Sequence, residues 1–598
     1  MRIGGDYGIL AEMEVKAVNL KVGRSNGREY LSIVHGIRDP ITHRVRTKTI
    51  QSLGYLDVLQ KEYSDPVAHF KQVVEQMNQQ SKTEKQPLTI RLDPYERLKT
   101  GQVYYKNLGY APLSLLYHEL GLDVFFRNHT RKLKVTFNVN NIVKRLVFGR
   151  ILDPSSKKKT VENKDWLFEN HDYTLDDVYR CLTFLPEEAN AVTIHIHKKV
   201  REQYGRVTEP VYYDVTNYYF EIDEQDEIRR KGVSKEHRPN PIVQMGLLMD
   251  NQGIPIAYKL FPGNTNDCET LIPILREVKR EFEVERLIVV ADKGMNTTRN
   301  IVFNLLRRDG YVYSQTVRGA DKELQGYVLE QDGYRNKGED FRIKSRVYPR
   351  KIKVEDINGK KQKVDIDEKQ VAFYSRDYDR RAKAEREPAL LKARDLVNNP
   401  SKYNQATSYG AARYLKNLSY DKETGEVITT GRKPVFDEER LKREEQFDGY
   451  YVIISSETTK TDEEIVEIYR GLWKIEESFK VTKSSFHTRP VYLSRQDHIQ
   501  AHFLICFIAL VITRLLEKRL ANQYPISRIA ETLRQVNACF IGDNLFAFHF
   551  ADEVTHAIHN TLGIDLEMRF RSLGDIKKML GTTKKTLNPQ QHLSIPNS

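Results

Sequence analysis

Cysteine is scarce in this sequence, and long apolar runs are missing. The chain has only four cysteines: Cys181, Cys268, Cys506 and Cys539. They lie far apart without a CxxC pair, which argues against a structural zinc site or a disulfide framework. The longest strongly apolar run, Phe503 to Ile512, is about half of what a bilayer-spanning helix needs. The first residues, MRIGGDYGIL, contain no apolar signal core. We therefore expect a soluble, reduced, cytoplasmic protein that does not engage a membrane.

The composition instead indicates a folded, basic protein of several domains. A length of 598 residues suggests about three to five domains. Charged residues make up 30% of the chain, but 33 Tyr and 24 Phe exclude wholesale disorder. Lys and Arg number 95 against 82 Asp and Glu, a formal net charge of +13. This surplus favours a polyanionic partner.

Changes in pattern along the chain predict six regions. Residues 1–110 contain β-hairpins over 16–54 and a helix near 65–80, and residues 111–205 are helical. Two halves of one α/β core, 206–320 and 446–560, flank a highly charged insertion with β-like runs at 321–445. Residues 561–598 form a C-terminal tail, of which about the last twenty are expected to be disordered.

The helical region 111–205 carries an unusual cluster of positive charge. Between Arg127 and Thr160 there are ten Lys and Arg but one acid, Asp153. Such a cluster is either a solvated charged face or a phosphate-binding surface. The basic residues considered for the second role are Lys144, Arg145, Arg150, Lys157 and Lys158.

The two core halves share the element order of an RNase H-like fold. PVYYDVTNYYFE predicts a strand with Asp214 at its middle, followed by two strands, a helix near 267–281, the apolar strand RLIVVADKG, a helix near 297–308 and a further strand. FDGYYVIISS resumes the strand pattern after the insertion. A periodic helix then begins at Thr461, where Glu464 completes a capping box, and an apolar helix follows at 496–520.

Three acids stand out by their positions. Asp214 lies within an aromatic strand, Asp292 ends an apolar strand, and Glu476 lies on the helix after the next apolar strand. A carboxylate is costly to bury unless it is paired, hydrogen-bonded or bound to metal. Acids in two strands and a covering helix can converge at one end of a sheet, where they would form an oxygen cage for magnesium. Each acid taken alone is more often structural, and helical spacing does not choose between Glu476 and Glu477.

Cationic and aromatic residues surround the candidate helix. They could clamp a nucleic-acid backbone or stack on a base, or they could form an ordinary charged face with i,i+4 pairs. These residues are Tyr469, Arg470, Trp473, Lys480, Lys483 and Arg489.

Four segments together resemble the DDE transposases of bacterial insertion sequences, in the branch with a Tyr-Arg-Glu-Lys signature and a β-rich insertion. They are YYDVTNYYFE, LFPGNTNDCETL, VVADKGMNT and YRGLWKIEESFKVTKSSFHTRPVYLSRQDHIQAHFLICFIAL. The signature spacing fits Tyr469, Glu476 and Lys483, and the matching Ile-Glu pair favours Glu476 over Glu477. Leu472 occupies the Arg position, which leaves Arg470 or Arg489 as candidates for that role.

The resemblance implies an α/β fold with an RNase H-like mixed sheet, interrupted by the insertion and preceded by β-hairpin and helical DNA-binding regions. It also implies that Asp214, Asp292 and Glu476 hold two Mg²⁺ or Mn²⁺ ions. The reaction would be hydrolysis at each element end, followed by attack of the exposed 3′-hydroxyl on target DNA. The implied partner is double-stranded DNA, the terminal inverted repeats and the target, bound by a homodimer in the bacterial cytosol.

Two other functions remain open at the level of sequence. An RNase H-like structure-specific nuclease would cut DNA without joining it, and an inactive relative would only bind DNA. A two-carboxylate glycosidase does not explain the basic surplus.

Overall fold

The computed structural model describes residues 18–585, except 26, 39–44, 84–94, 96, 98–99, 102, 132–134, 170–171, 237, 356–359, 400–409, 418, 421–426, 429–432 and 543. The chain divides into two compact units, Met1–Arg97 and Leu98–Ser598. The stretch expected to be disordered at the C-terminus lies mostly outside the described residues.

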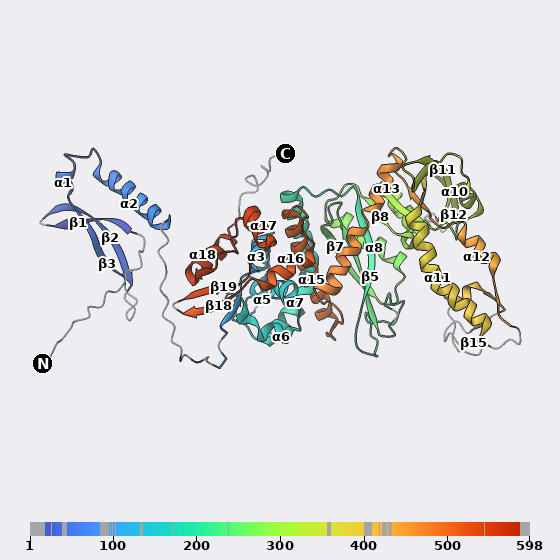
Figure 1. The fold of residues 1–598 in the computed structure, drawn as a ribbon, viewed down its shortest axis with the longest axis horizontal. Coiled ribbons are helices and arrows are strands. Elements are labelled where there is room, and N and C mark those ends of the chain that lie inside the picture. The colour runs from blue at the N-terminus through green and yellow to red at the C-terminus, as the bar shows by residue number, and fades with distance from the viewer. Residues whose placement is uncertain are drawn as a thin grey trace. The chain divides into compact units, whose positions relative to one another are not determined.

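The N-terminal unit is a small antiparallel sheet with one helix packed on it (Figure 1). Its strands are β1 (Val18–Ser25), β2 (Arg28–Arg38) and β3 (Val45–Tyr55), followed by α1 (Leu56–Leu59) and α2 (Pro66–Thr83). Val18, Ile33 and Val74 form its buried core. The Asn78 side chain exchanges two 2.9 Å hydrogen bonds with the backbone of Val18, which fixes α2 to the first strand.

A nine-stranded mixed sheet organises the second unit, in the order β10-β11-β12-β17-β9-β8-β5-β6-β7. The first core half supplies β5 (Val211–Tyr219), β6 (Ile242–Met249), β7 (Pro255–Pro262), β8 (Ile288–Ala291) and β9 (Gly310–Gln315). Pairing is antiparallel from β5 to β6 and β6 to β7, and parallel from β5 to β8 and β8 to β9. This is the strand arrangement of an RNase H-like core, and it confirms the predicted fold class.

Each face of this sheet has its own hydrophobic core. Val211, Tyr213 and Val215 of β5 face a core shared with α8 (Asp267–Glu281) and α9 (Thr298–Leu306). Tyr212 and Tyr218 face a larger core, which includes α14 (Trp473–Lys480) and α15 (Gln496–Arg519). Because side chains alternate along a strand, Asp214 belongs to the face of Tyr212, as the sequence pattern predicts.

The helical region packs around α15 rather than forming a domain of its own. It contains α3 (Ala111–Glu119), α4 (Leu122–Thr130), α5 (Val139–Leu152), α6 (Lys157–Glu162), η1 (Lys164–Trp166) and α7 (Leu175–Tyr204). α3, α5 and α7 all contact α15. By length and composition α15 could cross a membrane, but 94% of its apolar window is buried in the protein, as in a core helix.

Residues beyond α15 complete this half of the unit. The elements are α16 (Ile526–Gln535), β18 (Asn537–Gly542), β19 (Leu545–Phe548), α17 (Glu553–Leu562), β20 (Phe570–Ser572) and α18 (Leu573–Thr582). β18 pairs with β4 (Tyr105–Asn107), so residues before 110 belong to this unit. The prediction of a tail from 561 is therefore wrong up to α18, whose buried Ile576 and Leu580 join the main core.

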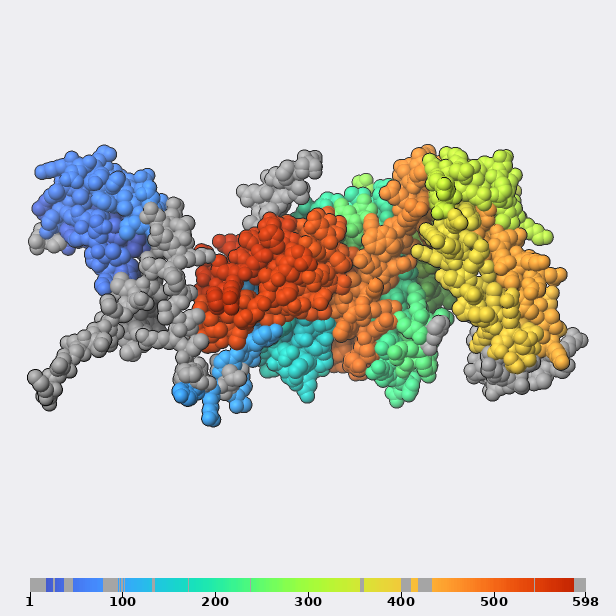
Figure 2. All heavy atoms as spheres, viewed as in Figure 1, coloured from blue at the N-terminus to red at the C-terminus, as the bar shows by residue number. Residues whose placement is uncertain are grey.

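Three strands of the insertion, β10 to β12, extend the main sheet, and two short strand pairs lie apart from it. The elements of the insertion are α10 (Lys322–Leu329), β10 (Arg335–Asn336), β11 (Phe341–Glu355), β12 (Lys361–Ser375), α11 (Arg376–Asn398), η4 (Ala411–Tyr414) and α12 (Glu438–Glu445), with short pairs of β13 (Leu415–Lys416) and β16 (Val435–Phe436), and of β14 (Ser419–Tyr420) and β15 (Val427–Ile428). β12 pairs with β17 (Tyr450–Ser455), which itself pairs with β9. In Figure 2 the atoms of α11, coloured yellow, are exposed along the surface.

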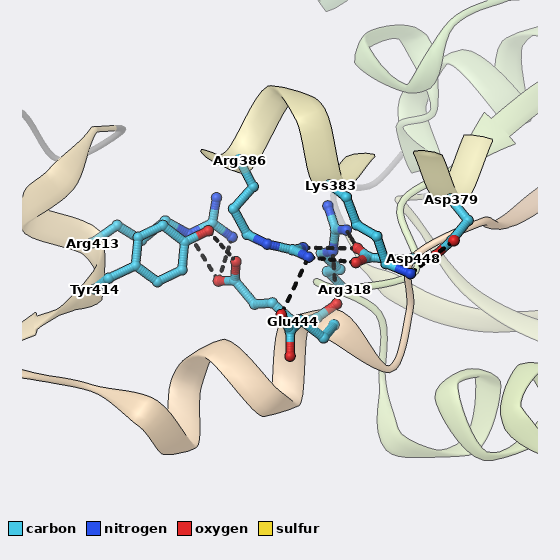
Figure 3. A network of polar contacts seen from close by, with 9 residues as sticks. Arg318, Asp379, Lys383, Arg386, Arg413, Tyr414, Glu444 and Asp448 are labelled. Atoms are coloured by element: carbon cyan, nitrogen blue, oxygen red, sulfur yellow. Dashed lines mark hydrogen bonds and ion pairs between the residues drawn. The ribbon is translucent and has the colours of Figure 1, made fainter. Parts of the chain in front are cut away.

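A buried ion-pair network fastens α11 to the core (Figure 3). Arg386 of α11 donates two hydrogen bonds to Asp448, at 2.8 and 2.5 Å. Arg318, which follows β9, donates to the same carboxylate at 2.6 Å. The Asp448 side chain is only 1% exposed. Asp448 lies just before β17, so its carboxylate links the insertion helix α11 to the segment that follows β9.

Replacement of the shared carboxylate should loosen the insertion. We expect Asp448→Asn to lower the free energy of unfolding by about 3 kcal/mol, because two guanidinium groups lose their buried counter-charge. Chemical denaturation of purified variants measures this. The control is Asp340→Asn at the exposed Arg376–Asp340 pair, where we expect a change below about 1 kcal/mol. Equal effects at the two positions would contradict a structural role for Asp448.

Candidate active site

Two acids come together because β5 and β8 are parallel neighbours. Tyr212 is in register with Val290, and the same register continued by two residues sets Asp214 opposite Asp292. Neighbouring strands lie about 4.8 Å apart, and in-register residues of parallel strands point to the same face. Asp292 also begins the short helix η2 (Lys293–Met295), where its Oδ1 accepts a 2.8 Å hydrogen bond from the Gly294 backbone. The strand pairing therefore places two carboxylates side by side at one end of the sheet.

The environment of Asp214 makes its charged form unfavourable. Burial raises the pKa of its carboxyl to about 6, and the negative charges of Asp292 and Glu476 contribute to the rise. Lys235 and a 2.7 Å hydrogen bond from the Val215 backbone act in the opposite direction. The carboxylates of Asp214, Asp292 and Glu476 therefore interact electrostatically, although 262 positions separate the first from the last in the sequence.

The helix expected from Thr461 is interrupted, and the interruption positions Glu476. α13 (Asp462–Arg470) begins with the predicted Thr461–Glu464 capping box and ends before Gly471. After Gly471 and Leu472, the chain continues as α14 from Trp473. A Cβ atom on Gly471 would lie 1.9 Å from the Tyr212 hydroxyl oxygen. The missing side chain thus lets α14 pack against β5, and a five-residue π-helical turn, η5 (Val481–Ser485), follows it.

The structure also separates Glu476 from its neighbour. Glu477 points toward α15, where Arg514 approaches its Oε2 at 3.3 Å. Glu476 lines a cavity of about 490 Å³ together with Asp292, Tyr469 and Leu472. Of the two glutamates, Glu476 is the one that faces the aspartates.

One wall of this cavity, which we call the α11 cavity, comes from the insertion. Tyr378, Arg381, Ala382 and Glu385 of α11 line it opposite the acids. Lys293 and Arg318 add positive charge from the core. The insertion therefore contributes directly to the candidate active site.

The donor set fits hard divalent cations. Carboxylate oxygens are the preferred ligands of Mg²⁺ and Mn²⁺. Burial raises the pKa of Asp214, with a smaller contribution from the charges of Asp292 and Glu476, and a bound cation would favour the ionised carboxylate instead. In the described parts of the chain, one trio, His559, Asp565 and Glu567, has ligand atoms all within 4.8 Å of one another. Asp214, Asp292 and Glu476 do not meet this 4.8 Å criterion, so their oxygen atoms lie further apart than those of ligands to one shared ion.

Apart from Lys144 and Arg145, the other predicted site residues fall into three groups. Tyr469 lies at the α11 cavity, where its hydroxyl is 2.8 Å from that of Tyr451 and burial raises its pKa. A second cavity collects residues from both predicted DNA-binding sets: Arg150, Lys157, Lys483 and Arg489. Exposed positions are held by Lys158, Arg470, Trp473 and Lys480.

Four of the five basic residues considered for phosphate binding in the helical region are buried, so they do not form a solvated charged face. Lys144 pairs with Glu169 at 2.7 Å, and both side chains are buried. Arg145 is 1% exposed and donates to the Asn163 carbonyl. Arg150 and Lys157 are buried as well, and only Lys158 is exposed. These side chains are buried because the helices that carry them pack around α15.

Sequence reasoning missed several residues of the site. Lys235 interacts with the carboxylates of both Asp214 and Asp267, and Asp267 interacts with Asp292. Asp267 lies in the quoted segment LFPGNTNDCETL, so that signal was available. Lys235 sits in a polar loop with no pattern of its own, and Arg381 lies in the insertion, far from any motif.

Two family models match parts of this chain. Residues 221–512 match the family model described as "Transposase DDE domain", which includes Asp292 and Glu476 and begins seven residues after Asp214. Residues 20–88 match "IS1634 family transposase, N-terminal domain". The two matches together cover more than half of the chain. No curated protein is significantly similar to it.

Two solved structures show distant similarity. A piggyBac transposase synaptic complex with hairpin DNA has 9% identity and a TM-score of 0.35, over 71% of this chain and 79% of that chain. A Mos1 transposase paired-end complex with the left transposon end has 13% identity and a TM-score of 0.13, over 40% and 66%. The RNase H-like assignment rests on the strand order of this chain rather than on these likenesses.

The raised pKa of Asp214 predicts how stability depends on pH. Between about pH 4 and pH 6 the unfolded chain releases a proton that the folded chain keeps, so stability falls as pH rises through this window and is flat above it. Without metal, Asp214→Asn should remove this loss and stabilise the protein at pH 7 by about 2–3 kcal/mol. Urea unfolding in a chelator measures both effects. Asp223→Asn, at an exposed site, is the control, and an Asp214→Asn protein no more stable than the parent would refute the prediction.

Gly471 should be sensitive to a single added methyl group. In Gly471→Ala the Cβ atom would collide with the Tyr212 hydroxyl and displace α14, so we expect a loss of about 1–3 kcal/mol in stability. Because Glu476 moves with α14, DNA cleavage should fall about a hundredfold in a protein that remains folded. Gly326→Ala, in a helix where no atom lies within 4 Å of the added carbon, should leave both unchanged. Wild-type cleavage by Gly471→Ala would show that Gly471 does not position Glu476.

Proposed function

Because the chain belongs to the DDE transposases of insertion sequences, we propose that Asp214, Asp292 and Glu476 are its metal-binding catalytic acids. The reaction is phosphodiester hydrolysis at the element ends, followed by transfer of the resulting 3′-hydroxyl to target DNA. The observation that carries this assignment is the parallel register of β5 and β8, which aligns Asp214 with Asp292 beneath the helix of Glu476.

The three acids take different parts in holding the metal and the DNA. Asp214 and Asp292 sit on paired strands, so their spacing is fixed by the sheet, whereas Glu476 reaches the site from α14. Two Mg²⁺ or Mn²⁺ ions held between them would activate the attacking hydroxyl or water and stabilise the leaving oxygen. Lys235 offsets the negative charge around Asp214, and Lys293 offers a cation for the scissile phosphate at the mouth of the cavity.

Positive charge from α11 replaces the missing signature arginine. Leu472 occupies that position and packs into the wall of the α11 cavity, while Arg470 lies against the ring of Phe341 at 5.6 Å. Arg381 is exposed and lines the cavity opposite Glu476. We assign to Arg381 the role of contacting the DNA backbone next to the cleaved bond.

The substrate also determines the expected assembly. Transposition joins two ends of one DNA element to a target, so we propose that a homodimer binds the paired ends. The exposed Trp473, Lys480 and Lys158 are available for contacts with double-stranded DNA. The place of action is the cytoplasm, where the protein meets the nucleoid.

Single substitutions of the acids test the assignment. Asp214→Asn, Asp292→Asn and Glu476→Gln should each reduce Mg²⁺-dependent cleavage of a DNA fragment carrying the element end by at least about a thousandfold, because each removes a charge that holds the metal. The matched control is Glu477→Gln, next along α14, which should keep cleavage within about threefold. Labelled ends and a supercoiled target measure cleavage and joining together.

The outcomes distinguish the competing functions. Joined products that depend on all three acids support the transposase reaction. Cuts without joined products would favour a structure-specific nuclease. Mg²⁺-dependent cleavage that survives all three substitutions would overturn the site, and DNA binding without cleavage by the parent protein would indicate an inactive relative.

A further inference from the structure

A second cavity, of about 520 Å³, lies between the helical region and the segment that follows α14. We call it the basic cavity. Arg150 and Lys157 of the helical region line it together with Lys483 and Arg489, and its described lining contains no Asp or Glu. Tyr492, which is 75% exposed, stands at its rim. The cavity is thus accessible from the surface and lined by four basic residues.

The four cations are not equivalent. Lys483 and Arg489 both pair with Glu236, which neutralises part of their charge. Arg150 donates to the carbonyl oxygens of Phe486 and Ser155, at 3.0 and 3.4 Å, and its buried Nε has no hydrogen-bond partner. These carbonyls accept hydrogen bonds but do not cancel its charge.

Lys157 is the more unusual case. Its side chain is buried, and its nearest polar partner is the Nδ1 of His502 at 3.4 Å. Burial and the charge of Arg150 lower the pKa of Lys157 to about 7, and burial keeps His502 neutral by lowering its pKa well below the usual value. Among the described residues neither Lys157 nor Arg150 forms an ion pair with an acid, unlike Lys144, which is equally buried and pairs with Glu169. Buried cations without counter-charge are costly unless a ligand supplies it.

We propose that the basic cavity binds one backbone phosphate of the element-end DNA, with Lys157 and Arg150 as its ligands. This inference rests on the proposed function. Lys483, which lines the basic cavity, lies seven residues after Glu476, beyond the end of α14 and in the π-helical turn η5. The two cavities are therefore joined by one short stretch of helical backbone. A strand with its cleaved bond at the acids can therefore place a nearby phosphate in the basic cavity.

Removal of the Lys157 charge should weaken DNA binding without destabilising the free protein. Lys157→Met keeps the length and apolar stem of the side chain but removes the charge. The free protein should be as stable as the parent or more so, because no acid loses a partner. DNA binding should weaken about tenfold, and the salt dependence of the binding constant should fall by about 0.9 in slope, the value for one phosphate.

The experiment measures binding by fluorescence anisotropy without divalent cations, in the Asp292→Asn background. The probe is a duplex taken from the DNA that flanks the gene, first selected for binding to the parent protein, with single phosphates then replaced in turn by neutral methylphosphonates. One position should weaken binding by the parent protein but not by Lys157→Met, and Lys157→Arg should restore the parent pattern. Lys159→Gln, at an exposed lysine two residues away, should behave as the parent.

Each other result decides against the proposal. Unchanged affinity and salt slope in Lys157→Met would refute the contact, and unfolding of Lys157→Met would show that the lysine is structural. If inorganic phosphate raises the melting temperature of the parent but not of Lys157→Met, while DNA binding is equal, the cavity takes free phosphate and not DNA. The experiment measures DNA binding and not cleavage. Its result therefore tests the phosphate contact even if the three acids prove not to be catalytic.

Discussion

The repulsion between carboxylates held side by side is the constraint on which the site depends. The pairing of β5 with β8 fixes Asp214 opposite Asp292 through backbone hydrogen bonds, and the close approach of Gly471 to Tyr212 brings Glu476 to the same end of the sheet. The sheet holds the two aspartates near each other, and α14 holds Glu476 near them. Burial raises the pKa of Asp214, the neighbouring acids add to the rise, and a divalent cation would offset both effects.

Sequence patterns predicted the elements of this arrangement well because the elements have local causes. The capping box at Thr461, the helix from Asp267 and the alternation around Asp214 are all visible over a few residues. The convergence of Asp214, Asp292 and Glu476 was predicted from strand ends and from resemblance. The structure brings the three acids close enough for the charges of Asp292 and Glu476 to contribute to the raised pKa of Asp214. We propose their catalytic role on this basis.

Features that depend on distant contacts could not be predicted in this way. Burial of Lys144 and Arg145 follows from packing around α15, and their charge alone made them look like surface residues. The break at Gly471 depends on Tyr212, and no periodicity signals a clash with another element. Likewise, Arg381 reaches the α11 cavity only because β12 joins β17 and Asp448 holds Arg386, two interactions across the insertion boundary.

The α11 cavity and the basic cavity share one physical logic with opposite signs. Beside the first, the Asp214 carboxyl is buried near Asp292 and Glu476; in the second, among the described residues, Lys157 and Arg150 are buried without an acid partner. Each is unfavourable in the free protein, and each is relieved by one component of a metal–DNA complex. A DNA strand that spans both cavities would stabilise the protein at two places. Metal ions would neutralise the carboxylates, and a phosphate would neutralise Lys157 and Arg150. Binding at the two cavities should consequently be coupled through the DNA strand, even though α14 and η5 keep the cavities apart.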